Sequence, residues 1–576
     1  MVDKSLIIQK LEEMTVLMEL KGENPFKIRA FSNASRVLQG ISDDIHELIR
    51  SGRLSEIKGI GKGITNFILE VDQSGEPEEL QNLKKQIPSS LLELLKIPGM
   101  GSKKVKAVWE KLKIQSIGEL EYACKENRLV ELEGFGEKTQ QKIVEGIELL
   151  KKYSDRHLLS EVLDVARDLR ELINKLPGVF CSEIAGSLRR WKEIVKDIDF
   201  VAAADTKDHK KIMDAFTSSH SVEKISSKGV KKSSVILKNG ITAELRIVSN
   251  DEFPFSLHHT TGSKEHNIVM REQAIKMKLK LNEYGLFREN GKKIDCKTEK
   301  ELFERLGLSY IPPELRENYG EIEAGLHHEI PKLIEMQHIE GIIHVHSTYS
   351  DGLHSIKELV DAAHSLGYRY LVISDHSKSA IYANGLTEER IAQQFQEIDE
   401  LNQTLEGFQI LKSIECDILT DGTLDYSDET LALFDLVICS IHSRFRMTES
   451  EATARILKAM ENPYTTILGH PTGRLLLARE GYPVNLRTII LAASDLNVAL
   501  ELNANPHRLD IDWRWLKFAK EKGVKISINP DAHRIEGIQD MRYGVGIARK
   551  GWLTAPDVLN SLPAEQVIRF AKSRHI

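Results

Sequence analysis

The sequence of 576 residues has few cysteines and no long apolar stretch, and each absence excludes a class of protein. Only five cysteines are present and none lies in a Cys-x-x-Cys pair, so neither a disulfide framework nor a cysteine zinc site is expected. No run approaches the roughly 18 apolar residues that a membrane-spanning helix needs. The first residues form an amphipathic pattern rather than a signal peptide. We therefore predict a cytoplasmic protein that does not contact membranes.

The net charge of −7 hides a difference between two parts of the chain. Residues 1–320 carry 53 Lys and Arg against 50 Asp and Glu, a balance of +3, whereas residues 321–576 carry 26 against 36, a balance of −10. Thirteen of the 20 histidines also lie after residue 320. Because imidazole is the commonest neutral metal ligand, metal sites are expected in the second part. The length predicts roughly four domains.

A hydrophobic-x-Gly-hydrophobic-Gly pattern occurs three times in the first 150 residues, each time before a helical stretch. Its glycine pairs are Gly59 and Gly61, Gly99 and Gly101, and Gly134 and Gly136. A tight turn before a helix exposes backbone N–H groups that can bind an anion, and glycine permits close approach of a phosphate. A single pair is as readily explained as a helix C-cap. Three copies instead indicate a repeated unit that resembles the helix–hairpin–helix, which holds DNA phosphates without reading the base sequence.

Two predicted strands carry carboxylates. Residues 196–202 alternate with period 2 and place Asp197 and Asp199 on one face, and residues 242–248 turn Glu244 outward. On their own, Asp197 and Asp199 are also compatible with an ordinary solvent-facing strand. The preceding Gly186-Ser187-Leu188-Arg189-Arg190 favours a triphosphate site, because hydroxyl, amide and guanidinium donors suit phosphate oxygens. The aspartates would then hold two Mg²⁺ ions for phosphoryl transfer.

Four motifs in order make residues 1–320 resemble the family X DNA polymerases. They are Gly186 to Arg190, Asp197 with Asp199, Thr261-Gly262-Ser263-Lys264-Glu265-His266-Asn267, and Leu281-Asn282-Glu283-Tyr284-Gly285-Leu286-Phe287. The resemblance implies a palm with a mixed sheet and a thumb. It also implies that Gly186, Ser187 and Arg190 bind the β and γ phosphates of a deoxynucleoside triphosphate. Further contacts to the nucleotide and the nascent base pair are implied for Gly262, Asn267 and Arg271.

The chain departs from the family pattern in three ways. The third catalytic carboxylate is Glu244 rather than aspartate, so we expect polymerisation to be reduced. His259 and Thr260 replace an aromatic pair beside the nucleotide sugar, which puts sugar selection in doubt. Phe67 stands where lyase members of the family have a lysine nucleophile, so lyase activity is not expected.

From about residue 340 onward, apolar strands alternate with amphipathic helices, which predicts a βα barrel. Polar residues follow each strand, where such barrels carry their chemistry. Gly341 to Gly352 contains His344 and His346 two residues apart on a strand, followed by Asp351. A histidine such as His376, taken alone, is more often a buried core residue. Nine candidate ligands after the strands of one domain instead predict a metal centre.

Residues 338–570 resemble the PHP (polymerase and histidinol phosphatase) phosphoesterase domain. Its metal-binding pattern is filled by His344, His346, Asp351, His376, Glu415, His442, His470, Asp531 and His533. Mixed imidazole and carboxylate ligands suit up to three ions of Mn²⁺, Zn²⁺ or Fe²⁺ and imply phosphodiester hydrolysis. Arg444 and Arg474, which follow two of the histidines, are candidate contacts to a DNA phosphate.

These observations predict a multidomain α + α/β protein: a helix–hairpin–helix region (1–150), a nucleotidyltransferase-type palm with thumb (151–312), a linker (313–339) and a C-terminal βα (PHP) barrel (340–576). Mg²⁺ or Mn²⁺ is expected at Asp197, Asp199 and Glu244. The combination implies a DNA-directed DNA polymerase with 3′-5′ exonuclease activity that fills gaps and processes 3′ ends in DNA repair. Its partners would be gapped or primer-template DNA, with nucleoid association, and deoxynucleoside triphosphates.

Two other functions remain open from the sequence. The first is a PHP nuclease whose weakened polymerase core mainly holds DNA, which Glu244 and Thr260 motivate. The second is a small-molecule phosphatase of the histidinol-phosphate type, against which the glycine repeats argue.

Overall fold

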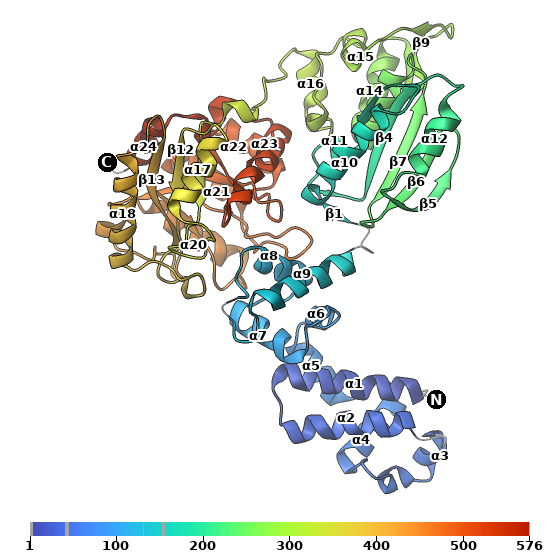
Figure 1. Ribbon diagram of the computed structural model, residues 1–576, viewed down its shortest axis with the longest axis vertical. Helices are drawn as coiled ribbons and strands as arrows, with labels where there is room; N and C mark the ends of the chain where they lie inside the picture. Colours follow the sequence, from blue (N-terminus) through green and yellow to red (C-terminus); the bar gives the residue numbers. More distant parts are fainter. Residues whose placement is uncertain (1–3, 41–44, 131, 152–155, 575–576) are drawn as a thin grey trace. The chain divides into compact units, whose positions relative to one another are not determined.

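The computed structural model describes residues 4–40, 45–130, 132–151 and 156–574 (Figure 1). They form two compact units, Met1–Leu150 and Lys151–Ile576, which are described separately below. Within the described ranges, no helix is long and apolar enough to cross a membrane.

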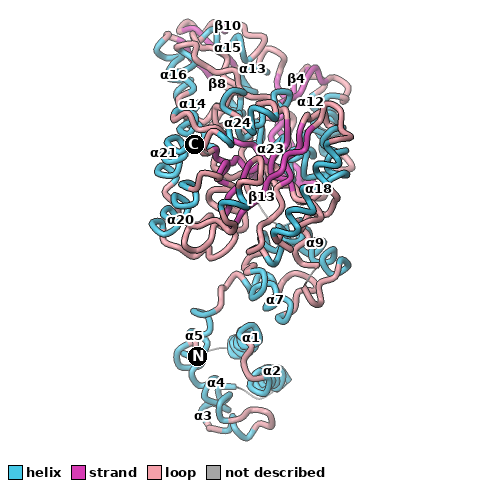
Figure 2. Tube along the Cα trace, turned by 90° about the vertical axis from the view of Figure 1, so that its left-hand side faces the viewer, coloured by secondary structure: helices cyan, strands magenta, loops and turns pink. Residues whose placement is uncertain are grey.

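The described residues of the first unit form helices and no strand, as Figure 2 shows by colour. Buried apolar side chains from along the unit join in one core. This confirms the predicted helical N-terminal region. The elements are α1 (Lys4–Lys21), α2 (Pro25–Gly40), α3 (Ile45–Arg50), η1 (Arg53–Glu56), α4 (Lys62–Ser74), α5 (Glu78–Gln86), α6 (Leu91–Leu94), α7 (Ser102–Leu112), α8 (Ile117–Lys125) and α9 (Glu137–Lys151).

The second unit begins with a mixed sheet in the order β2-β4-β7-β6-β5. Strands β4 and β7 are parallel and the other pairs are antiparallel. The elements are β1 (His157–Leu158), α10 (Leu159–Asn174), β2 (Val179–Ile184), α11 (Gly186–Arg189), β3 (Ile194–Val195), β4 (Asp197–Ala204), α12 (His209–Thr217), β5 (Val222–Lys228), β6 (Lys232–Leu237) and β7 (Thr242–Val248). The alternation in β4 buries Ile198, Phe200 and Ala202, so its carboxylates lie on the opposite face. The predicted palm with a mixed sheet is confirmed.

A smaller thumb follows the palm. It contains α13 (Phe253–Thr261), α14 (Lys264–Lys276), an antiparallel sheet of β8 (Leu279–Asn282), β9 (Gly285–Arg288) and β10 (Lys293–Ile294), and α15 (Glu299–Arg305). Residues 313–339, for which we predicted a linker, contain η2 (Pro313–Leu315), α16 (Glu321–Leu326) and η3 (Met336–His338). Leu315, Ile322 and Leu333 of this segment are buried in the thumb's apolar cluster.

The rest of the chain is a seven-stranded parallel barrel whose strands follow one another in sequence order. They are β11 (Gly341–Val345), β12 (Tyr370–Ile373), β13 (Gln409–Asp417), β14 (Leu436–Ser440), β15 (Thr465–Leu468), β16 (Ala499–Asn503) and β17 (Ile526–Asn529). The barrel nearly closes, because the His346 N–H donates to the Ala532 carbonyl at 2.9 Å, just past the last strand. This confirms the predicted βα barrel.

Helices surround the barrel strands, yellow to red in Figure 1. They are α17 (Ile356–Ser365), η4 (Ile381–Ala383), α18 (Glu388–Asn402), α19 (Asp428–Leu431), α20 (Glu449–Glu461), α21 (Leu486–Leu496), α22 (Trp513–Glu521), η5 (Ile535–Asp540), α23 (Met541–Lys550), η6 (Ala555–Asp557), η7 (Leu559–Ser561) and α24 (Ala564–Lys572).

A buried ion network ties the thumb to the palm. The Glu299 carboxylate of α15 accepts a hydrogen bond of 2.7 Å from the Arg189 guanidinium of α11 and another from fully buried Arg316. The Arg316 guanidinium also lies 5.0 Å from the ring centroid of Phe303. Burial alone raises the pKa of Glu299, but Arg316 and Arg189 hold it at about 2, so the carboxylate stays ionised.

Removing the shared carboxylate should destabilise this unit. Glu299→Ala leaves Arg316 buried without its counter-charge, and we expect the free energy of unfolding to fall by about 3–5 kcal/mol. The matched control is Glu304→Ala on the same helix, whose exposed ion pair with Lys300 spans 3.9 Å. It should change stability by less than about 0.5 kcal/mol. Urea unfolding followed by tryptophan fluorescence measures both, and equal midpoints would contradict this account.

Candidate active sites

All nine histidine and carboxylate residues singled out in the barrel lie together at the carboxyl ends of its strands. His344 and Glu415 lie within β11 and β13, and the others follow strand ends. Parallel strands in a barrel direct their carboxyl ends to one rim, which explains the convergence of residues that are far apart in sequence. Every member except the partly exposed Asp351 and His442 is buried.

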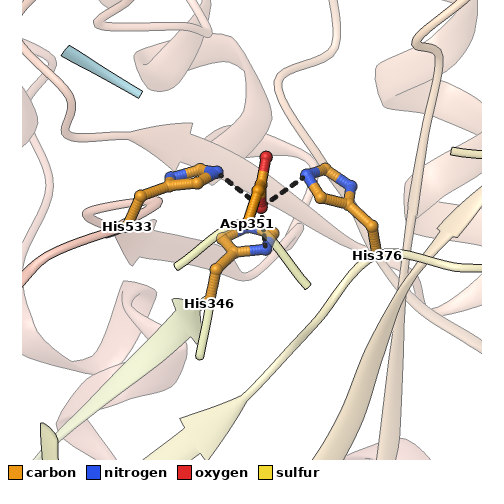
Figure 3. A group of neighbouring side chains, drawn as sticks. All are labelled: His346, Asp351, His376 and His533. Atoms are coloured by element: carbon orange, nitrogen blue, oxygen red, sulfur yellow. Dashed lines mark ion pairs between the residues drawn. The ribbon is translucent and has the colours of Figure 1, made fainter. Parts of the chain in front are cut away.

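Eight of the nine residues, all but His470, form three overlapping groups whose possible ligand atoms lie within 4.8 Å of one another. The groups are His346, Asp351, His376 and His533; His344, His346 and Asp531; and His376, Glu415 and His442. Figure 3 shows the first group, in which three imidazoles surround one carboxylate. The Asp351 Oδ1 atom lies 3.4 Å from His533 Nε2, 3.6 Å from His376 Nε2 and 3.9 Å from His346 Nδ1. These spacings let one cation contact all four side chains.

Glu415 is the carboxylate that the surrounding histidines share. Its oxygens lie 2.9 Å from His470 Nε2, 3.0 Å from His376 Nδ1 and 3.1 Å from His442 Nε2. Burial alone raises the pKa of Glu415, but the facing histidines His442, His344 and His376 hold it well below its ordinary value. An ionised carboxylate in this position would be a ligand for a divalent cation.

The imidazoles of the cluster differ in pKa: burial lowers the pKa of His346 and His470, whereas Glu415 and the carboxylates Glu501 and Asp417 raise the pKa of His344 and His442 against the effect of burial. Burial, with His533 and His376 nearby, lowers the pKa of His346 to about 3, so this ring is neutral. His344 Nε2, His346 Nδ1 and His376 Nε2 are buried nitrogens without a hydrogen-bond partner among the described residues. Buried polar atoms are rarely left unsatisfied, so these nitrogens fit a bound cation.

Two buried carboxylates behind the cluster are absent from the sequence prediction. Glu501 of β16 accepts hydrogen bonds from His344 Nδ1 at 2.6 Å and from the His470 backbone N–H at 2.6 Å. Asp417 of β13 lies 2.5 Å from His442 Nδ1. Such partners fix the orientation of a ligating imidazole. Asp417 was detectable, because it lies two residues after Glu415 on one strand face, whereas Glu501 resembles a core position in an apolar strand.

Arg474, a predicted DNA contact, has partners within the barrel. Its guanidinium pairs with Asp512 at 2.8 Å and donates to the backbone carbonyl of Arg508 at 3.0 Å. Its contact with DNA stays a prediction. Arg444 lies exposed in the loop after β14 and stays a prediction.

The three predicted polymerase carboxylates lie on neighbouring strands of the palm. Asp199 on β4 is directly opposite Glu244 on β7, and Asp197 is two residues earlier. Burial, followed by the charges of Asp197 and Glu244, raises the pKa of Asp199 to about 7. Lys232 pairs with Glu244 at 2.8 Å. The trio is not among the compact ligand groups found in the described chain.

The Gly186-Ser187 segment, which begins α11, packs tightly beside these carboxylates. Gly186 has a φ of +63°, and a Cβ there would overlap the Asp199 carboxylate, so glycine is required. Arg190 Nη1 donates to the Thr261 carbonyl at 2.7 Å, and Arg190 Nε donates to Glu317 at 3.0 Å. The partly buried Ser187 lies next to Gly186 in α11.

The Thr-Gly motif connects α13 to α14 in the thumb. The Asn267 side-chain amide donates to the carbonyl of His259 at 2.8 Å and to that of Gly262 at 3.1 Å, so it holds this connection in shape. Arg271 is exposed on α14. The two residues are thus placed differently, one in the scaffold and one on the surface.

The three glycine pairs each precede a helix, α4, α7 or α9, and do not act as C-caps. Gly59, Gly99 and Gly134 have positive φ values, and the hydrophobic residue after each is buried. Their partners Gly61, Gly101 and Gly136 do not have positive φ, and a Cβ on them would meet nothing within 4 Å. The fold itself therefore does not require glycine at these three exposed positions, whereas a closely approaching ligand would. Phe67, the position of the missing lyase lysine, is buried against Phe31.

Comparisons with known families agree with this architecture. Residues 2–77 match the helix-hairpin-helix domain, residues 91–148 the SAM-like helix-hairpin-helix tandem, residues 256–317 the DNA polymerase beta thumb and residues 343–533 the PHP domain. The fold and its sites thus define a polymerase-type core joined to a PHP domain.

Similar proteins identify the family to which the whole chain belongs. The DNA polymerase/3′-5′ exonuclease PolX of Bacillus subtilis (strain 168) is 40% identical over 572 residues, which cover 99% of both chains. The chain belongs to this PolX family. A probable phosphatase of Thermoanaerobacter sp. (strain X514) is 27% identical over 229 residues, 38% of this chain and 89% of that protein. A probable phosphatase of Clostridium novyi (strain NT) is 25% identical over 205 residues, 33% of this chain and 78% of that protein.

The buried carboxylate behind the cluster provides a test of the metal centre. Glu501→Gln keeps the shape of the side chain but removes the charge that orients His344, so we expect 3′ hydrolysis to fall by about 10- to 100-fold. Apparent metal affinity, measured by titrating Mn²⁺, should fall in parallel. Glu461→Gln, an exposed change at the end of α20, is the control and should have no effect. Unchanged hydrolysis in Glu501→Gln would contradict the role assigned to this carboxylate.

Proposed function

We propose that this chain is a DNA-directed DNA polymerase with a 3′-5′ exonuclease, which fills gaps and processes 3′ ends in DNA repair. The observation that carries the proposal is that one chain holds two separate acidic or histidine-rich sites, the β4/β7 carboxylates and the barrel cluster. Membership of the PolX family over nearly the full length supports both activities. Its proposed substrates are gapped or primer-template DNA and deoxynucleoside triphosphates, and its proposed location is the cytoplasm, in association with the nucleoid.

In the polymerase site, Asp197, Asp199 and Glu244 are the residues that hold Mg²⁺ or Mn²⁺. When bound, such ions offset charge on the reacting phosphoryl group. Their proximity on paired strands supports this assignment, since Asp199 and Glu244 are directly opposite each other. Gly186, Ser187 and Arg190 bind the triphosphate, and Gly262, Asn267 and Arg271 position the nucleotide. Because Asn267 braces the backbone after α13, it acts on the nucleotide through the shape of that connection.

In the barrel, the nine clustered residues hold up to three ions of Mn²⁺, Zn²⁺ or Fe²⁺. When bound, such ions activate water and polarise a phosphoryl oxygen. The neutral His346 ring and the shared Glu415 carboxylate support this reading, because both are groups that can bind a divalent cation. The cluster lies at the barrel rim, with Asp351 and His442 partly exposed, so a DNA 3′ end can approach it.

A nuclease whose polymerase core mainly holds DNA is the second candidate. The ion pair between Lys232 and Glu244 favours it, because the lysine competes with a cation for the third carboxylate. Single-nucleotide incorporation on a one-nucleotide gapped duplex, in Mg²⁺ and in Mn²⁺, separates the candidates. Absence of incorporation in both metals, with 3′ hydrolysis intact, would establish the nuclease.

The two activities should separate by mutation. Asp197→Ala combined with Asp199→Ala should abolish nucleotide addition, because the ion-holding carboxylates are lost. It should leave 3′ hydrolysis within about twofold of wild type, because the barrel cluster is a separate site. Gapped-duplex extension and hydrolysis of a 3′-labelled single strand measure the two activities on one preparation. Asp205→Ala combined with Asp208→Ala, just past the end of β4, is the matched control. Loss of both activities in a folded protein would mean that the nuclease site is misassigned.

The six glycines Gly59, Gly61, Gly99, Gly101, Gly134 and Gly136 are the proposed DNA contacts. Gly101→Val is the sharpest test, since a Cβ at this position meets no neighbour and the fold should tolerate it. We expect duplex affinity to fall by a similar factor for every sequence, because only phosphate contacts are lost. Fluorescence anisotropy on several unrelated duplexes measures this. Gly63→Val, one residue into α4 and equally open, is the control. Equal affinities for the two variants would contradict the proposal.

A further inference from the structure

A fully buried lysine of the barrel contacts the palm at the loop of residues 190–192, which follows α11. Lys550 is the last residue of α23, and its ammonium donates to the Glu317 carboxylate at 2.7 Å and to the backbone carbonyl of Arg190 at 2.9 Å. It also donates to the Glu314 carbonyl at 3.4 Å. All three donor positions of the ammonium are therefore used by the polymerase part of the unit.

Three cations share the Glu317 carboxylate. Besides Lys550, the Arg190 guanidinium lies 3.0 Å from Glu317 Oε1 and the Lys192 ammonium 3.3 Å from the same oxygen. Burial alone raises the pKa of Glu317, but Lys550, Arg190 and Lys192 hold it at about 2. Burial lowers the pKa of Lys550 to about 8 against the effect of Glu317, so the lysine is charged at neutral pH. One negative and three positive charges give this group, Arg190 included, a net charge of +2.

Aromatic contacts seat the same loop on the barrel. The Trp191 ring lies so close to Gly546 of α23 that a Cβ on this glycine would overlap it. The Lys192 and Lys550 ammonium groups lie 5.4 and 4.5 Å from the ring centroid of Trp513, on α22. Residues 190–192 are therefore in contact with two barrel helices through charge and through packing.

Loss of Lys550 would act on Arg190 in two ways. The backbone carbonyl of Arg190 would lose its donor, so the loop would lose an anchor. Glu317 would keep only two cations, so its negative charge would be balanced more by Arg190 itself. Both effects weaken an arginine that must offer its charge to a phosphate, because a guanidinium neutralised by a carboxylate binds a second anion less strongly.

We propose that Lys550 is a positioning residue for deoxynucleoside triphosphate binding, through which the barrel holds Arg190 ready for the triphosphate. The inference rests on the proposed role of Arg190 as a phosphate ligand. It assigns the barrel a task in polymerisation that is independent of its own metal cluster.

The test is steady-state incorporation on a one-nucleotide gapped duplex, with 3′ hydrolysis of a single strand measured on the same preparations. Lys550→Met should raise the KM for the nucleotide about tenfold, the loss expected for one charge-assisted hydrogen bond. Its kcat and its 3′ hydrolysis should stay within about twofold of wild type, since a KM effect alone reports lost binding. Lys550→Arg restores the charge and should recover part of the affinity, which a purely structural role does not predict.

The matched control is Arg542→Met. Arg542 also joins the barrel to the palm, through an ion pair of 2.8 Å with the partly exposed Asp164, but it does not touch Arg190 or Glu317. Its KM should equal that of wild type. If Arg542→Met raises the KM as much as Lys550→Met does, the effect is one of general docking and the proposal is overturned.

Arg190→Ala distinguishes failure of the inference from failure of the proposed function. An unchanged KM in Arg190→Ala would show that Arg190 does not bind the triphosphate. A raised KM in Arg190→Ala together with an unchanged KM in Lys550→Met overturns the positioning role alone. If Lys550→Met does not fold, Lys192→Met takes its place, because it also removes a cation from Glu317, and an unchanged KM in that variant overturns the proposal.

Discussion

Near-closure of the parallel barrel is the constraint on which the histidine cluster depends. The His346 N–H reaches the Ala532 carbonyl, which brings the residues after the last strand beside those of the first. Without that contact, Asp531 and His533 would be separated from His344 and His346, and the imidazoles that surround Glu415 would not form one cluster. The negative charge of Glu415 also holds the cluster together, because buried histidines from several strands face this single carboxylate.

The sequence predicted those parts of the fold that local pattern determines. Continuous apolar strands predicted the barrel, and polar residues just past each strand, such as His376 and His470, predicted the cluster. Period 2 in residues 196–202 placed Asp197 and Asp199 on the face that the structure gives them. The repeated glycines indicated turns before helices, and the structure places a helix after each pair.

Contacts between distant residues had no such signal. Lys550 and Glu317 are 233 residues apart, and nothing near either position marks an ion pair. Glu501 lies inside an apolar strand, so its position resembles core rather than site. The place of Arg474 after His470 suggested a DNA contact, and nothing nearby in the sequence marked its ion pair with Asp512, which comes from another segment.

The network around Glu299 has a mechanical consequence for the polymerase core. The carboxylate belongs to the thumb and Arg189 belongs to the palm, so any rotation of one against the other must pull a buried ion pair apart. Because separating such a pair costs several kcal/mol, thermal motion would populate a rotated thumb only rarely. The thumb and palm should therefore move together.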